Sequence, residues 1–435
     1  MRIAVQSLVW GGVNNEGSIS EGINNKSGAT VHSIKNVALR NKGTIGKVVN
    51  NGVMSAEAPN ASGVYNRETG IIDSVENNGV IKSVNSAGIY NKGKVDKIVN
   101  TGLIEGGEGS IVNHGMVNNG IDNFWVLSGQ VVLGNATLKL FGDNSHVYGM
   151  TTGDDRSAVN VGATDNITHY TTNFDVQVGS INVAAGSTLQ LKNGTTWSAS
   201  SLEKDSITVS GRYISDGMTT LVGNVVNNSE IRLNSGGGQI AGNVITIKGN
   251  YEGGQDSRLY FNTVLGGDGS SSDKLVVEGN TTGTSSVYIN NQNGAGAYTD
   301  RGIELINISG NSNGHFTQAN RVVAGAYDYY LQRGTRDNEN VNNWYLVNTK
   351  PTLTPEPTPT PEPTPTPERA HRAELASYAS NIQAANTLFN MTLHDRVGEN
   401  QYIDALSGEK KATSMWMRLI GGHNGSSMSD KQNKT

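Results

Sequence analysis

The residues most suited to catalysis form one short cluster, Asp154, Asp155 and Arg156. Two carboxylates and a cation are the groups that an enzyme of the polysaccharide-lyase kind needs. Three adjacent residues of a strand or turn point in different directions, however, so they share a site only if other segments contribute to it. We therefore expect a solvated loop here, and a β-helix enzyme acting on polysaccharide remains an alternative.

A second cluster, GGDGSSSDK from Gly266, has some likeness to the GDSGS motif of serine proteases. Its order is Asp-Gly-Ser rather than Asp-Ser-Gly, and no protease-like domain upstream supplies the histidine and aspartate that such a serine needs. We expect a turn at this position. The chain also has no cysteine, which excludes thiolate catalysis and thiol-bound metal.

Metal and nucleotide sites are not predicted. The scattered histidines have no partner at the spacing i, i+2 or i, i+4 that would bring two ligands to one metal. The phosphate-binding pattern GxxxxGK[ST] and the calcium-binding nonapeptide are both missing. We expect no catalytic residue, no cofactor, no metal and no small-molecule substrate. The histidines considered are His32, His114, His146, His169 and His315.

The composition is that of a chain with many turns. Its 435 residues are 35% hydrophobic and 16% charged, and 55 of them are glycine, which is unlike an ordinary globular enzyme. The formal net charge of -5 gives no electrostatic reason to bind a polyanion, so nucleic acid is not expected as a partner. No stretch approaches ~18 uninterrupted apolar residues, so a membrane role would need β-strands.

An asparagine repeat organises residues 13–120. Asn41, Asn66 and Asn91 are 25 residues apart, and a fainter copy follows at Asn113. Each unit is a short run of isoleucine and valine between Asn-Gly or Asn-x-Gly turns. Such runs are too short for stable helices, so the period predicts a solenoid of β-strands. Coils stacked ~4.8 Å apart would bury the apolar side chains and align the four asparagines in a structural ladder of hydrogen bonds.

A proline-rich segment separates two parts of different composition. Alternation of apolar with Ser, Thr and Asn residues continues beyond the repeats, and we assign residues 1–248 to the β-solenoid. The segment PTLTPEPTPTPEPTPTP, within a linker at 349–368, holds eight of the nine prolines. Polyproline II rises ~3.1 Å per residue, so these residues would form a spacer of roughly 50 Å.

The sequence after the linker predicts a helix and then a strand. Residues 369–400 have almost no glycine or proline, and apolar side chains recur at steps of three and four. In residues 401–435, Met415, Met417 and Leu419 alternate with polar or aromatic side chains, as in a strand of a membrane barrel. The expected helix face comprises Leu375, Ala379, Ile382, Phe389 and Leu393.

Two segments resemble a known family. The run ASYASNIQAANTLFNMTLHDRVGE with TSMWMRLIGGHNGS resembles the start of the translocator barrel of AIDA/pertactin-type autotransporters. Residues 249–348, with GNYEGGQDSRLYFNTVLGGDGSSSDKLVVEGN and NVNNWYLVN, look like the autochaperone region of that family. The resemblance implies an all-β fold, a right-handed parallel β-helix of the pertactin or pectin-lyase-like type, followed by the linker, one pore helix and an incomplete barrel.

The autochaperone region of this family is thought to start the folding of the passenger. Residues 249–348 gather aromatic side chains that the preceding repeats lack, and aromatic burial contributes strongly to stability. A stable last coil would also cap the exposed end of the solenoid. The aromatic residues expected to form this cap are Tyr251, Tyr327, Tyr329, Tyr330, Trp344 and Tyr345.

The resemblance also implies a place and a role for the chain. The family exports its passengers to the outer membrane and cell surface, so we expect an adhesin or a self-associating rod without catalysis. Its partners would be host-cell or matrix glycans and proteins, or identical passengers. With one barrel strand and no recognisable export signal, the sequence is expected to be truncated relative to the family. A non-functional fragment of an interrupted gene is a further alternative.

Overall fold

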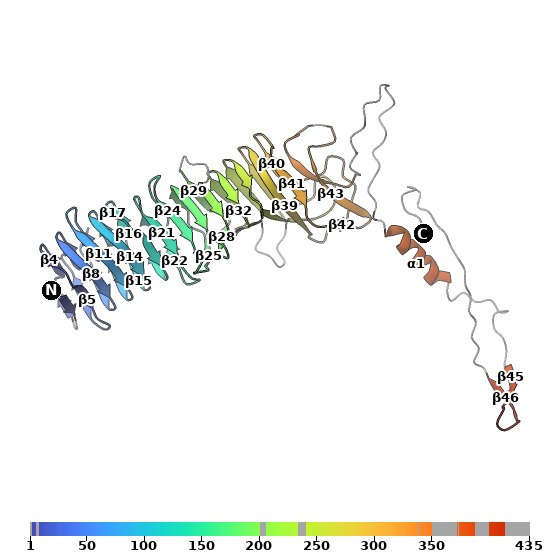
Figure 1. Cartoon of the computed structure of the whole chain (residues 1–435), viewed down its shortest axis with the longest axis horizontal. Coiled ribbons are helices and arrows are strands. Elements are labelled where there is room, and N and C mark those ends of the chain that lie inside the picture. Colours follow the sequence, from blue (N-terminus) through green and yellow to red (C-terminus); the bar gives the residue numbers. More distant parts are fainter. Residues whose placement is uncertain are drawn as a thin grey trace.

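The computed structural model describes residues 2–5, 8–200, 206–233, 241–337, 339–349, 372, 374–387 and 400–413. The chain from its N-terminus to about residue 320 forms an elongated rod of short β-strands that stack coil upon coil (Figure 1). Nearly all strand pairs in the rod are parallel, so the fold is all-β and a parallel β-helix. Each coil contributes strands to two or three sheets that run along the rod.

Sheet 1 is the largest of the three sheets among the described residues and has 21 strands. In chain order they are β1 (Arg2–Val5), β4 (Ser18–Ile19), β5 (Gly22–Asn25), β8 (Thr44–Asn50), β11 (Ile71–Asn77), β14 (Lys94–Asn100), β17 (Met116–Val117), β18 (Ile121–Asn123), β21 (Thr137–Leu140), β24 (Ala158–Val161), β25 (His169–Thr172), β27 (Ser180–Val183), β28 (Thr188–Lys192), β30 (Ile207–Val209), β31 (Arg212–Asp216), β33 (Val225–Asn227), β34 (Glu230–Arg232), β36 (Tyr251–Gly253), β37 (Arg258–Thr263), β39 (Thr281–Asn291) and β41 (His315–Gln318).

Sheet 2 runs along a second side of the rod, and its described part has 16 strands. In spatial order they are β3 (Val13–Asn15), β7 (Leu39–Asn41), β10 (Val64–Asn66), β13 (Ala87–Asn91), β16 (Gly109–Asn113), β20 (Val131–Val132), β23 (Thr151–Thr152), β26 (Val176–Val178), β29 (Thr196–Ala199), β32 (Met218–Val222), β35 (Val244–Lys248), β38 (Lys274–Val277), β40 (Ile303–Ile308), β44 (Trp344–Val347), β43 (Tyr327–Arg333) and β42 (Val322–Ala324).

Sheet 3 is restricted to the N-terminal part of the rod and has seven described strands. In spatial order they are β2 (Leu8–Trp10), β6 (Thr30–Ser33), β9 (Val53–Ala56), β12 (Val80–Ser83), β15 (Leu103–Gly106), β19 (Val126–Ser128) and β22 (His146–Tyr148).

The core of the rod is built from rows of identical or similar apolar residues. Ile45, Ile72 and Val95 occupy one register position on successive coils, and each is at most 1% exposed. Because side chains alternate between the two faces of a strand, every second residue points inward and adds to such a row. Most of the buried apolar residues form one continuous cluster along the rod.

Glycines at the corners let the coils stack closely. A Cβ atom added to Gly79 would lie 2.1 Å from the carbonyl oxygen of Gly52, and one added to Gly102 would lie 2.1 Å from that of Gly79. No side chain fits between backbones at this separation. The Asn-Gly pairs of the repeat therefore follow from close stacking as well as from the geometry of the turn.

The parallel stacking ends in an antiparallel cap. Strand β44 pairs antiparallel with β40, the last parallel strand of sheet 2, and β43 pairs antiparallel with β44 and with β42. Beyond the cap, the described residues form the helix α1 (Leu375–Thr387) and a hairpin of β45 (Asn400–Ile403) and β46 (Lys410–Thr413). Within the described part of the chain, no helix has the length and apolar character needed to cross a membrane.

Helix α1 occupies the middle of the segment predicted as helix. Its residues Ala379 and Ile382 are exposed, the latter to 64%. Leu375 begins the helix. The other members of the expected face, Phe389 and Leu393, lie outside the described residues, as do the predicted linker from 350 to 368 and the predicted barrel strand with Met415, Met417 and Leu419.

Candidate functional site

The predicted asparagines Asn41, Asn66, Asn91 and Asn113 lie in one row along sheet 2. Each ends a strand, and the side-chain Nδ2 of each donates to the Oδ1 of the next at 2.8, 2.8 and 2.7 Å. Asn15 extends the row toward the N-terminus, with a hydrogen bond of 2.8 Å to Asn41. The four predicted asparagines are at most 1% exposed, so the ladder is an interior feature of the rod.

A second ladder runs along sheet 1 and consists of five asparagines at the ends of successive strands. Its four Nδ2 to Oδ1 hydrogen bonds measure 2.7, 2.8, 2.9 and 2.8 Å. From the sequence alone, Asn50, Asn77 and Asn100 are recognised only as the start of the second Asn-rich turn in each repeat unit. The ladder spacings of 25, 27, 23 and 23 residues indicate a repeat, but turns of unequal length make that repeat hard to recognise in the sequence. The members are Asn25, Asn50, Asn77, Asn100 and Asn123.

Each internal amide uses its hydrogen-bonding capacity without water. The Nδ2 of Asn77, for example, donates to Asn100 and also to the carbonyl oxygens of Gly79 and Leu103, while its Oδ1 accepts from Asn50. A buried amide is tolerated only when its groups are paired in this way. The ladders therefore fix the register of the coils as well as stabilise them, because a shifted coil would leave several amides unpaired.

One ladder ends on a backbone carbonyl oxygen and the other on a hydroxyl side chain. Asn113 donates to the carbonyl oxygen of Leu133, and Asn123 donates to the Oγ of Ser145 at 2.8 Å. Further along the rod, Asn227 donates to Ser257 at 2.8 Å, and Ser257 is 2.8 Å from Ser285. Interior polar contacts thus continue into the cap with different residue types.

The predicted cap aromatics are brought together in part. Tyr251, Tyr329, Trp344 and Tyr345 are buried, whereas Tyr327 is half-buried and Tyr330 is 37% exposed. The Tyr251 and Trp344 rings are joined through Phe316, with ring centroids 6.1 and 5.3 Å apart, and sequence reasoning did not single out Phe316. The C-terminal end of the core therefore has an aromatic cluster that closes it against solvent.

Two buried tyrosines use their hydroxyl groups to join separate coils. The Tyr251 hydroxyl lies 3.0 Å from Ser257 Oγ and 2.8 Å from Ser285 Oγ, and burial raises the pKa of this phenol. The Tyr329 hydroxyl donates to the carbonyl oxygen of Gly266 and accepts from the backbone amide of Ala297. Both phenols remain neutral donors over the ordinary pH range.

The candidate catalytic cluster has no recognisable catalytic geometry. Asp154 and Arg156 form an exposed ion pair of 3.2 Å beside an open hollow of about 450 Å³, to which His114 also contributes. In the GGDGSSSDK segment, Asp273 is fully buried, and its carboxylate accepts from backbone amides of Gly242 and Asn262. Among the described residues, no three His, Asp or Glu side chains are placed to hold a metal ion.

Comparison with known proteins assigns the C-terminal third of the rod and part of its cap. Residues 219–331 match the family model of the Autochaperone Domain Type 1. The chain is 39% identical over 195 residues to the Autotransporter adhesin AIDA-I of Escherichia coli, a match that covers 45% of this chain and 14% of AIDA-I. Residues 219–331 thus match an autochaperone domain, and the chain is similar to AIDA/pertactin-type autotransporters. The autochaperone match overlaps the aromatic cap of this chain.

Two further relatives are proteins of Escherichia coli K12. The uncharacterized protein YuaQ is 48% identical over 209 residues, covering 48% of this chain and 15% of YuaQ. The uncharacterized protein YdeU is 46% identical over 209 residues, covering 47% of this chain and 44% of YdeU. This chain thus spans less than half the length of each of these relatives.

The substitution Asn77→Ala tests the ladder. It removes three donated hydrogen bonds and leaves the amide of Asn50 and the Oδ1 of Asn100 without their buried partner. We expect a loss of about 3 kcal/mol in unfolding free energy, since unpaired buried polar groups cost 1–3 kcal/mol each. Urea unfolding followed by circular dichroism measures it. The neighbouring Asn78→Ala, at an exposed position, is the matched control, and an equal loss in both variants would contradict the assignment.

The substitution Tyr251→Phe tests the cap network. The ring stays in place, but Ser257 and Ser285 lose their common partner in a buried site, so we expect a loss of about 2 kcal/mol. Urea midpoints measured by tryptophan fluorescence provide the readout. Tyr288→Phe is the control, because that ring is half-buried on the outer surface and stacks on Tyr260. The network has no stabilising role if both variants unfold at the same midpoint.

Proposed function

We propose that this chain is an autotransporter passenger displayed at the outer membrane and cell surface, where its rod makes adhesive contacts and carries out no catalysis. The contact best supported by the geometry is with a second copy of the same rod. One observation carries this proposal: the outward side chains of sheet 3 form two rows that are complementary to the same rows read in the opposite direction.

The first outward row is mainly apolar. Leu8, Val53, Val80, Leu103 and Val126 occupy one register position across sheet 3, with a threonine between the first two. Leu8 is 48% exposed, and the other four are half-buried. An apolar row on a solvent-facing sheet is a feature that marks interaction surfaces.

The second outward row carries charges at its centre. Lys82 and Glu105 lie on adjacent strands, two residues along from the first row, and are flanked by Ser128 and by Ser55, which is buried. Lys82 and Glu105 are exposed neighbours, yet neither takes part in an ion pair among the residues that the structure describes. Elsewhere on the rod, lysines pair with acids of an adjacent coil, as Lys97 does with Asp122 at 2.6 Å.

Two rods can be paired face to face through sheet 3 by a two-fold axis that runs along the strand direction between β12 and β15. This axis brings each row of one copy opposite the same row of the other. It leaves positions along a strand unchanged and reverses the order of the coils, so two rods would lie antiparallel. Lys82 would then face Glu105 of the second copy. In the apolar row, Val80 would face Leu103. With the axis along the rod instead, the charged row would face the apolar row, which disfavours parallel pairing.

The proposed contact is narrow. Six facing strands at ~4.8 Å cover roughly 25 Å of the rod, which is below the size of a stable interface between two soluble proteins. A single pair would therefore be weak and readily reversed. Many copies on facing surfaces would act together, because multivalent attachment strengthens weak contacts by orders of magnitude.

Adhesion to host-cell or matrix glycans and proteins is the second candidate. AIDA-I and the Brucella suis protein BmaC, 35% identical over 197 residues, both carry the word adhesin in their names. Beads coated with the full chain, placed on surfaces coated with matrix glycoprotein, test this role. Attachment without bead clustering would favour adhesion to other molecules over rod pairing.

Charge reversal on sheet 3 tests the pairing. On beads coated with the full chain, we expect Lys82→Glu and Glu105→Lys each to reduce clustering at least about tenfold, because like charges would meet at both ends of the two-fold contact. Turbidity or microscopy measures clustering. Beads carrying one variant mixed with beads carrying the other should cluster again, since the charges are then complementary.

The matched control is Lys94→Glu, which reverses an exposed lysine on sheet 1 and should leave clustering unchanged. The double variant K82E/E105K should cluster like the original chain. Rod pairing through sheet 3 is wrong if the single variants cluster normally, or if the mixture does not regain clustering.

A further inference from the structure

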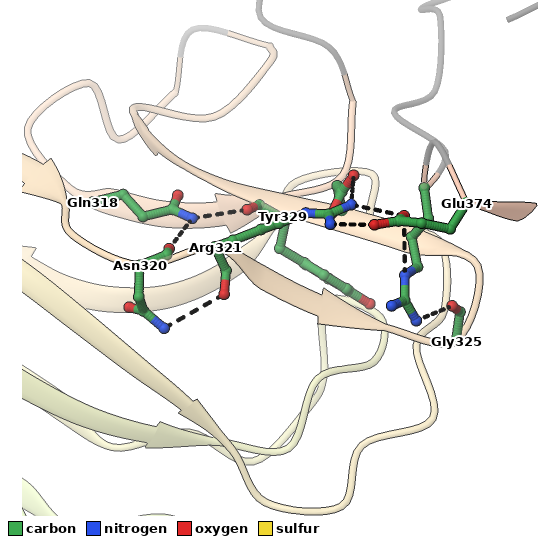
Figure 2. A network of polar contacts seen from close by, with 8 residues as sticks. Gln318, Asn320, Arg321, Gly325, Tyr329 and Glu374 are labelled. Carbon is green, nitrogen blue, oxygen red and sulfur yellow. Dashed lines mark hydrogen bonds and ion pairs between the residues drawn. The ribbon is translucent and has the colours of Figure 1, made fainter. Parts of the chain in front are cut away.

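The cap carries a charged site that binds a later part of the same chain. Arg321 precedes β42, and its guanidinium donates to both carboxylate oxygens of Asp328 in β43 at 3.0 and 3.1 Å. The same guanidinium donates to Glu374, 53 residues further along, with one hydrogen bond of 3.0 Å (Figure 2). Asp328 is nearly buried, so it holds the arginine in place, while Arg321 and Glu374 are half-exposed.

A second contact fixes the same segment beside the turn of the β42–β43 hairpin. The backbone amide of Arg372 donates to the carbonyl oxygen of Ala326 at 3.1 Å, and its Nη1 donates to that of Gly325 at 3.2 Å. Glu374 immediately precedes α1, where its carbonyl oxygen accepts from the amide of Tyr378 in the first turn. The start of the helix is thus docked on the cap.

The end of the rod is attached to the same corner of the cap. Asn348 follows β44, donates to the carbonyl oxygen of Ala297 and accepts from the amide of Thr299. This segment lies against the hairpin turn, because a Cβ added to Gly325 would be 2.1 Å from the carbonyl oxygen of Ala295. Residues on both sides of the predicted linker therefore meet at one place. While Arg372 and Glu374 are docked, the start of the helix lies against the cap.

Charge rather than apolar contact holds the helix start. Tyr378 and Ile382 of α1 are 52% and 64% exposed. Half-exposed ion pairs are individually weak and are screened by salt, so the docked arrangement is reversible. The groups that face Glu374 are Arg321 and Arg372, and Asp328 shares Arg321 with it.

We propose that Arg321, Asp328 and the hairpin turn form a latch for Arg372 and Glu374, and that its release frees the start of α1 from the cap. Docked, the latch fixes the position of the helix start relative to the rod. Released, it lets the helix start move away from the rod. This inference does not depend on whether rods pair.

The test measures the distance between rod and helix in the full chain. Because the chain has no cysteine, Asn313→Cys and Ser377→Cys provide two exposed positions for spin labels. We expect one narrow distance distribution for the original chain. Glu374→Lys should reduce the docked population about tenfold and broaden the distribution, because repulsion from Arg321 replaces the hydrogen-bonded ion pair between Arg321 and Glu374. Glu409→Lys, the same charge change on the exposed β45–β46 hairpin, should have no effect.

Acid provides a second measurement on the unsubstituted chain. Hydrogen bonds from Arg321 lower the pKa of Glu374 to about 2. Above the ordinary pKa near 4.5, the ionised carboxylate therefore stabilises the docked state fully. This stabilisation is lost as the pH falls through about 2. Glu374→Gln should show the released distribution already at neutral pH. A narrow distribution that persists in Glu374→Lys, or a broad one in the original chain, would overturn the latch.

Discussion

The whole rod depends on backbone hydrogen bonds between parallel coils that stay in register, and the buried asparagine amides enforce that register. A parallel coil can slip by one residue and keep most of its backbone pairs, but it would then bury polar side chains and expose apolar ones. The amides of Asn50 and Asn77 pair only when their coils are aligned, because each needs its neighbour and two backbone carbonyl oxygens. Close stacking at the glycine corners and the continuous apolar core both presuppose this alignment.

The regular parts of the structure could be predicted from the sequence because their physics is periodic. An equal spacing of 25 residues placed Asn41, Asn66 and Asn91 at one position of successive coils, and the alternation of apolar residues indicated strands. The second ladder was harder to predict, since its turns differ in length. Asn15, Asn25 and Asn123 lie where the repeat is weakest, and only the pairing of strands shows that they belong to the rows.

Contacts between non-equivalent segments could not be predicted in this way. The pairing of Arg321 with Glu374 joins residues that share no repeat position, and its partner Asp328 has no distinguishing sequence context. The proline-rich linker alone suggested a spacer, because composition determines its reach but not where its ends are attached. The aromatic cap was found by composition, although the burial of Tyr329 and the exposure of Tyr330 depend on the antiparallel turn of β43.

The direction of the asparagine hydrogen bonds has an electrical consequence. In both ladders the Nδ2 of each residue points toward the following coil and its Oδ1 toward the preceding one, so the amide dipoles are aligned head to tail. At the first member of the sheet 1 ladder, the Oδ1 of Asn25 is buried and has no hydrogen-bond partner among the described residues. The interior is thus polarised along its length, as a helix is by its peptide groups. Two such rods side by side would repel if they pointed the same way and attract if they pointed in opposite ways.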